Sequence, residues 1–175
     1  MVGIEAPDAA IARPSIAGAL GLGLLTAMAT GPFAMLLLVV VMIAGDPSEL
    51  VDEPLAILGS LATLFTFGSI LATLVTVIIG WLPISLFGWL IQTAARRWPA
   101  FRHRGVWAAV GAVAAGLLVA LFGGAIDDVI KDPDPANWER LRDMGAFGGG
   151  CGIFAALFFR WLSARSILEP VAPRA

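Results

Sequence analysis

The chain has 175 residues, of which 59% are hydrophobic and only 14% are charged, with a formal net charge of −2. An average soluble domain carries about 25% charged residues, so this composition excludes an ordinary water-soluble domain and favours an integral membrane protein. The single cysteine, Cys151, excludes an intrachain disulfide and a paired-cysteine redox motif. No charge-rich linker or internal repeat divides the chain, so we expect one membrane domain over residues 1–175.

The first apolar run predicts a membrane span over about residues 16–44. One crossing needs roughly 20 apolar residues, so this run is long, and the pair Gly31-Pro32 in its middle is an expected kink. A cleaved signal peptide ending at Ala29 is the alternative interpretation. Cleavage there would leave a hydrophobic stub, because the apolar sequence continues to Ala44.

The second run, Leu55 to Ala95, is 41 residues without a charged side chain. We expect one crossing over about 55–80, a kink or an end at Pro83, and a cytoplasmic interfacial helix over about 84–98, because proline disrupts a helix interior. The alternative is a double crossing that turns near residues 80–83. A turn there would move the arginines of residues 96–104 to the other side of the membrane.

The third and fourth spans are predicted at about residues 106–126 and 144–162. The fourth contains Arg160, whose guanidinium would reach the headgroups while its methylenes stay among the acyl chains. Before it, Asp134 is a candidate N-cap and Pro135 a candidate first residue of a short outer helix over about 135–142. The acidic residues that begin at Asp127 also suggest a weak Ca²⁺ or Mg²⁺ site, which we consider less favoured than this structural role.

The loops predict the orientation of the four spans. The segment 46–54 contains acids and no base, 96–104 contains arginines and no acid, and 127–143 contains more acids than bases. Short basic loops stay cytoplasmic, so 96–104 and both termini are expected inside and the two acidic loops outside. We therefore expect a four-transmembrane-helix bundle, with a bacterial inner membrane as its location.

Small residues mark two candidate faces for helix packing or for lining a path. In the second span they recur at steps of three and four, which places them on one side of a helix. In the fourth span two glycines form a GxxxG pair, which allows close approach of two backbones. The candidate residues are Ser60, Thr63, Thr66, Ser69, Thr73, Thr76, Gly148 and Gly152.

Tryptophans and arginines around the basic loop are candidate contacts to lipid headgroups. Indole rings favour the membrane interface, and guanidinium groups bind lipid phosphates. The candidate residues are Trp81, Trp89, Trp98, Arg96, Arg97, Arg102 and Arg104.

The predicted spans lack the acid and base side chains that catalysis needs. They contain no Asp, Glu, Lys or His, and the lone His103 lies in the basic loop. Coupling carboxylates and haem-ligating histidines are therefore not expected at membrane depth. We predict no catalytic, metal or cofactor site, and the absence of such groups argues against an enzyme.

Two functions follow from these features. The first is a non-enzymatic multi-pass membrane protein that acts as a packing, scaffold or accessory subunit, with the lipid bilayer and another copy or another membrane protein as partners and no nucleic acid. The second is a small transport or channel component in which the Ser/Thr face lines a path for a neutral or weakly polar solute.

Overall fold

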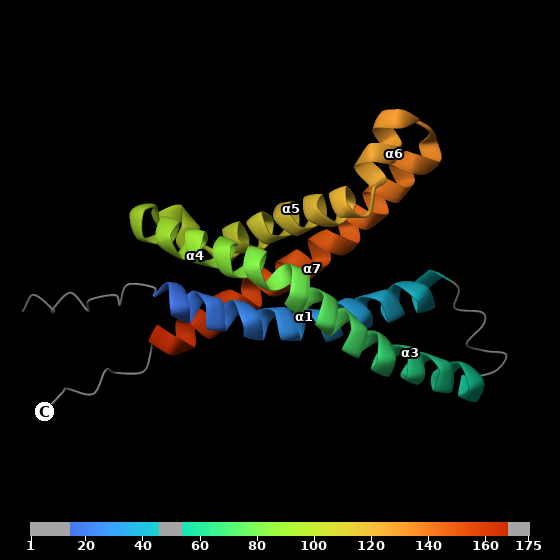
Figure 1. Ribbon diagram of the computed structural model, residues 1–175, viewed down its shortest axis with the longest axis horizontal. Coiled ribbons are helices and arrows are strands. Elements are labelled where there is room, and N and C mark those ends of the chain that lie inside the picture. Colours follow the sequence, from blue (N-terminus) through green and yellow to red (C-terminus); the bar gives the residue numbers. More distant parts are fainter. Residues whose placement is uncertain (1–14, 46–53, 168–175) are drawn as a thin grey trace, which may run out of the picture.

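The computed structural model describes residues 15–45 and 54–167, and every regular element in these two ranges is a helix (Figure 1). Four of the helices are long and apolar enough to cross a membrane: Ile16–Ala44, Ile57–Ala95, Arg104–Phe122 and Pro135–Ala164. This confirms the predicted class, an all-helical membrane protein with four candidate spans. The acidic segment 46–53, the N-terminal 14 residues and the residues after 167 lie outside the described ranges.

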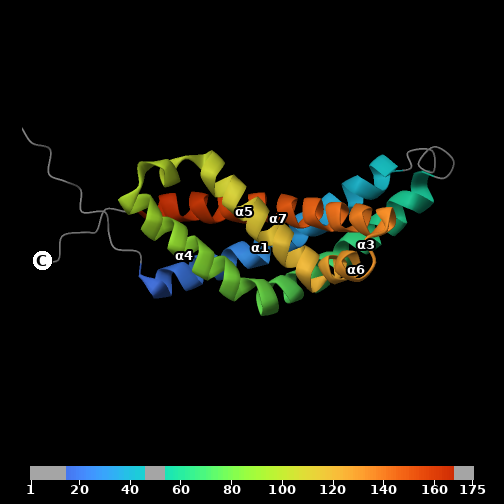
Figure 2. The same ribbon diagram turned by 90° about the horizontal axis from the view of Figure 1, so that it is seen from above.

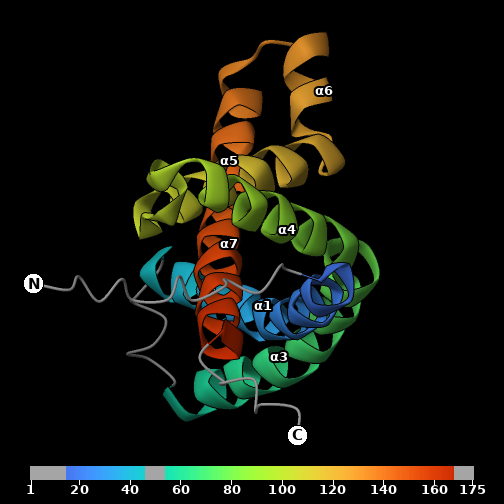
Figure 3. The same ribbon diagram turned by 90° about the vertical axis from the view of Figure 1, so that its left-hand side faces the viewer.

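Helix α1 (Ile16–Gly45) runs through Pro32 without ending. It lies antiparallel to the long second helix, and Figure 3 shows that second helix wrapping around it. Gly31 is the point of closest approach: a Cβ atom on it would lie 2.5 Å from the backbone nitrogen of Thr73. Only a residue without a side chain fits there, so the glycine beside Pro32 sets how near the two backbones come.

The second long helix comprises α3 (Pro54–Val75), a π-helical segment η1 (Thr76–Gly80) and α4 (Trp81–Arg97), with no loop between them. The chain therefore does not reverse near residues 80–83, and the double crossing is wrong. The helix also continues through Pro83, where an end or kink was expected. The helix therefore does not end there, and the ribbon bends in the region of η1, just before that proline (Figure 2).

The π segment explains how the helix accommodates Pro83. In a regular α-helix the proline ring would clash with the carbonyl of Ile79, four residues earlier, and that carbonyl would lose its donor. Ile79 lies inside η1, where the wider π turn moves the carbonyl away from its usual position. The irregularity thus falls upstream of the proline that causes it.

The third and fourth spans form a hairpin. Helix α4 is followed by the short 3₁₀ segment η2 (Pro99–Arg102) and by α5 (Arg104–Phe122), which packs along α7 (Pro135–Ile167). The predicted third span extended to residue 126, but α5 ends at Phe122. Gly124 then takes a positive φ of 75°, a conformation that glycine adopts without strain.

A short helix, α6 (Ala125–Lys131), and the start of α7 form the far end of this hairpin. Helix α7 begins at Pro135, as the Asp134-Pro135 pair predicts, and the Asp134 carbonyl accepts from the backbone of Asn137. The predicted outer helix 135–142 and the predicted fourth span are one continuous helix. No helix-breaking residue separates them, so the chain has no reason to interrupt the helix at residue 143.

The buried core lies where the four long helices meet. Trp107 of α5 and Phe159 of α7 are almost fully buried, and their rings lie 6.3 Å apart. Ala19 of α1 and Ile91 of α4 complete this cluster. The core thus ties α1, α4, α5 and α7 together at the end of the molecule that carries η2, while α3 contributes nothing to it.

Candidate functional site

The row of Ser and Thr residues along the second helix divides into two groups with different surroundings. Ser60, Thr63 and Thr66 are exposed on α3. The hydroxyls of Thr63 and Thr66 donate to the carbonyls of Gly59 and Ala62, one turn earlier in the same helix. These hydrogen bonds satisfy the hydroxyls internally, so both threonines can face lipid without cost.

The second group lies against α1. The hydroxyl of Thr76 is 2.9 Å from the carbonyl of Ala27 and also within reach of two carbonyls of its own helix. Thr73 packs beside Gly31, and its hydroxyl donates to Ser69. The Ser69 hydroxyl is itself buried without a hydrogen-bond partner. Thr73 and Thr76 therefore mark a contact between α1 and the second long helix, at the start of the π segment and just before it.

Gly148 and Gly152 lie at the crossing of α7 and α5. A Cβ atom on Gly152 would lie 2.0 Å from the carbonyl oxygen of Gly111, and one on Gly148 would lie 2.7 Å from the carbonyl oxygen of Ala115. The GxxxG pair of the fourth span thus faces a neighbour in the same chain. Gly111 is the counterpart that sequence reasoning could not assign, because the motif does not reveal its partner.

The three tryptophans predicted at the headgroups occupy different environments. The indole N–H of Trp81 donates to the carbonyl of Leu20 in α1, at 2.9 Å. Trp89 is half-buried against the core cluster, and Trp98, at the end of α4, is 57% exposed. Of the three, Trp98 has the exposure that a headgroup contact needs, whereas Trp81 joins two helices.

The arginines gather at the η2 end of the molecule. Arg97, Arg102 and Arg104 are exposed, and no acidic side chain pairs with them in the described ranges. Arg102 donates to the carbonyl of Ala95, and Arg160 of α7 donates to the carbonyl of Arg102. Four elements, α4, η2, α5 and α7, thus place positive charge together. The side chain of Arg96 lies outside the described residues.

An apolar groove adjoins this basic cluster. It has a volume of about 80 Å³, with walls from α4 and α5 and a floor from α7. Ile84, Phe87 and Ile91 face Val110 and Ala114 across it, and Phe159 lies at its base. Helices α4 and α5 are joined through η2 and scarcely contact each other elsewhere. Figure 1 shows the two helices diverging from η2. Sequence reasoning missed this groove because it depends on how three distant helices are rotated.

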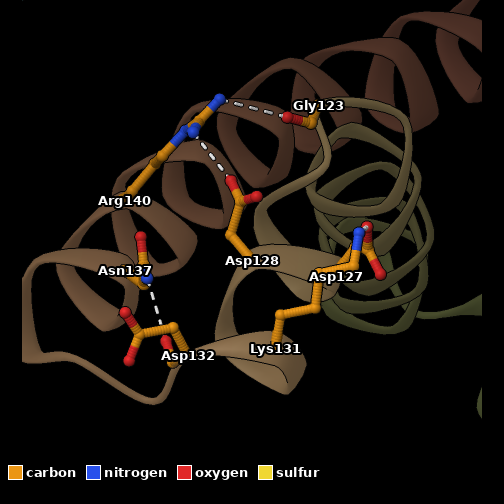
Figure 4. Close-up of polar contacts among 7 residues, drawn as sticks. All are labelled: Gly123, Asp127, Asp128, Lys131, Asp132, Asn137 and Arg140. Atoms are coloured by element: carbon orange, nitrogen blue, oxygen red, sulfur yellow. Dashed lines mark hydrogen bonds and ion pairs between the residues drawn. The ribbon is translucent and has the colours of Figure 1, made fainter.

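Ion pairs organise the opposite end of the molecule, where α6 meets α7 (Figure 4). Asp128 accepts from Arg140 at 2.7 Å, and the same guanidinium donates to the carbonyl of Gly123. Asp127 pairs with Lys131, and this hydrogen bond and attraction raise the pKa of Lys131 above its ordinary value. Within the described residues no group of three or more His, Cys, Asp or Glu side chains is placed to hold a metal ion.

The second helix is the least covered of the four. Only 6% of the residues in the most apolar stretch of Ile57–Ala95 are buried, against 22% in α1. Among the other helices, α3 makes its contacts with α1, and it projects away from α5 and α7 (Figures 1 and 3).

Comparison of the chain with protein-family models, with curated proteins and with solved structures found no match.

Proposed function

We propose that the protein is a non-enzymatic membrane subunit that packs against another copy of itself or another membrane protein through α3. The observation that carries this proposal is the stripe of exposed apolar residues on that helix. Phe67, Leu71 and Leu74 of α3 and Ile78 of the adjoining η1 follow one another at steps of four, three and four, and each is more than half exposed. Such spacing is typical of the seam between two helices that cross at a small angle.

The small residues on the same helix support this role. Ser60 and Thr63 continue towards the start of α3 and are exposed there. Small side chains let a second backbone approach closely, which is the main source of helix association in lipid. The transport alternative has less support, because Thr63 and Thr66 face outward while the groove inside the molecule is lined by apolar residues.

The proposed topology has four crossings, with both termini and the basic cluster cytoplasmic and the acidic segments outside, in a bacterial inner membrane. The 39 residues of Ile57–Ala95 reach about 58 Å at ~1.5 Å per residue, nearly twice a hydrocarbon core of about 30 Å. We propose that α3 and η1 cross the membrane and that α4 extends along the cytoplasmic interface, bending at η1. Leu82, Leu86 and Leu90 would be its exposed apolar row.

The mass of the purified protein tests the proposed function. The wild-type chain, extracted in mild detergent or in nanodiscs, should form a defined oligomer or retain a defined partner. A double variant, Phe67→Ala with Leu71→Ala, should be a monomer without the partner, because the substitutions remove two side chains from the centre of the stripe. The matched control is Val113→Ala with Leu117→Ala, two exposed residues one turn apart on α5. A clean wild-type monomer without a partner would contradict the proposal.

A further inference from the structure

The basic cluster and the apolar groove are neighbours along the same helices. Trp107, at one end of the groove, is three residues from Arg104, or about 4.5 Å along α5. Ile91 is six residues from Arg97, or about 9 Å along α4. The indole of Trp107 donates to the carbonyl of Phe101, so η2 lies across this end of the groove. A ligand that contacts both features would have a charged end at η2 and an apolar tail between α4 and α5.

The lining of the groove identifies the tail. Its residues are almost entirely apolar, and on α5 they run from Trp107 to Leu118, about 16 Å along the helix. One leaflet of the hydrocarbon core is about 15 Å deep, half of roughly 30 Å. Along α5 the groove therefore has the length and the chemistry to contact one lipid acyl chain, although its volume of about 80 Å³ encloses only a few of the chain's methylene groups.

The charges around η2 identify the headgroup. Arg97, Arg102 and Arg104 are exposed, and guanidinium groups bind phosphate oxygens through paired hydrogen bonds. All acidic side chains in the described ranges follow Phe122 and lie at the other end of the molecule. A choline or ethanolamine cation at η2 would meet no carboxylate from the described part of the chain. We therefore expect this arginine cluster to bind headgroups with a net negative charge more tightly than zwitterionic headgroups.

We propose that the α4–α5–α7 groove binds one anionic phospholipid, with an acyl chain in the groove and the phosphate on Arg102 and Arg104. The site does not involve α3, so it goes beyond the proposed packing role, and either proposal can fail without the other. Arg160 is a positioning residue, since its hydrogen bond to the carbonyl of Arg102 holds η2 over α7.

Native mass spectrometry of the full chain in neutral detergent tests the headgroup. Phosphatidylglycerol and phosphatidylcholine with identical acyl chains are titrated separately. We expect phosphatidylglycerol to bind about thirtyfold more tightly, and Arg102→Gln with Arg104→Gln to remove that preference, since each of the two arginines contributes about 1 kcal/mol to anionic lipid binding. The control, Lys131→Gln with Arg142→Gln, removes two exposed charges at the other end and should change nothing. Equal binding of the two lipids by the wild type would overturn the proposal.

A second comparison tests the groove. Ala114→Phe fills the groove and should reduce phosphatidylglycerol binding. The control Val113→Phe adds a phenylalanine on the outer side of α5, where Val113 is 62% exposed, and should leave phosphatidylglycerol binding unchanged. A measurement on the wild type makes the test independent of how these variants fold. Inorganic phosphate and glycerol phosphate, each at the same concentration as the lipid, should fail to displace the bound phosphatidylglycerol. Displacement by either would show binding through the headgroup alone and would overturn the proposal.

Discussion

The α5–α7 hairpin and the α1–α3 pair are built from similarly apolar helices, yet they pack very differently. Helices α5 and α7 are in contact along most of α5, and glycines on both sides bring their backbones together. Helix α3 meets α1 at the Gly31–Thr73 contact, at Met35 with Gly68, and through the hydrogen bond from Thr76 in η1. The outward side of α3 is left uncovered.

The difference shows what controls packing when the solvent is lipid. Apolar side chains gain little by leaving lipid for protein, so close contact depends on small residues and on hydrogen bonds between helices. Gly111 and Gly152 supply such contact inside the hairpin. On α3 the small residue Thr63 is exposed, and its hydroxyl bonds within its own helix. An uncovered face with small residues is therefore the natural place for a partner.

The largest expected effect is at the tightest contact of the hairpin. Gly152→Ala places a Cβ atom against the carbonyl of Gly111, and backbone atoms cannot move aside cheaply. We expect a loss of about 1–3 kcal/mol in the free energy of unfolding, measured by thermal or denaturant unfolding in detergent. Gly145→Ala is the matched control on the same helix, because a Cβ atom there contacts nothing within 4 Å. It should be neutral or stabilising by up to about 1 kcal/mol.

A smaller but similar effect is expected in the α1–α3 pair. Gly31→Ala would meet the backbone of Thr73, at a point where only one side of α3 is held. Because α3 can shift outward, we expect a loss of about 1 kcal/mol, below that of Gly152→Ala. Gly21→Ala, in the same helix with open space around it, is the control. If Gly31→Ala destabilises the protein more than Gly152→Ala, the proposed difference between the two regions is wrong.

The interhelical hydrogen bond at η1 should contribute less than either glycine contact. Thr76→Val keeps the shape of the side chain and removes the donor to Ala27, with an expected loss of about 0.6 kcal/mol in the free energy of unfolding. Thr63→Val removes a hydroxyl that bonds only within its own helix and should have no measurable effect. Equal losses in the two variants would show that Thr76 does not join α1 to the second helix.

The smallest effect is expected at the ion pairs beyond α5. Lys131 and Asp127 are both mostly exposed, so near neutral pH Lys131→Met should change stability less than any of the destabilising substitutions above. Because the pKa of Lys131 is raised in the folded protein, any contribution from this pair is complete below the ordinary lysine pKa and disappears as the pH rises through the raised value. Unfolding curves of wild type and variant should therefore converge at strongly alkaline pH.

Much of the architecture could be predicted from the sequence because hydropathy reports the depth of a segment in the membrane. The lengths of the uncharged runs were enough to predict four helices, and Asp134-Pro135 was enough to predict where α7 begins. Hydropathy does not report how a helix is rotated about its axis. The partner of Gly152, the bond from Trp81 to α1 and the groove beside Phe159 all depend on that rotation.

The second helix shows a further limit of sequence reasoning. Pro83 predicted that the helix ends or kinks, and the helix does not end there. A proline can be tolerated when the preceding turn widens, and the sequence does not signal that a π segment will form at residues 76–80. The short helix α6 was also missed. Its residues were read as a loop because its aspartates suggested solvent exposure, although Asp127 and Lys131 stabilise it as a pair one turn apart.

Photo-crosslinking in native membranes tests most directly whether α3 is the partner surface. A photoreactive phenylalanine analogue replaces Phe67 in the middle of α3 or, as the matched control, Phe122 at the end of α5; both side chains are at least 70% exposed. At Phe67 we predict one protein adduct of discrete mass, either the dimer or a single partner, and at Phe122 only lipid adducts. Lipid adducts alone at Phe67, or the same protein adduct at both positions, would contradict the account.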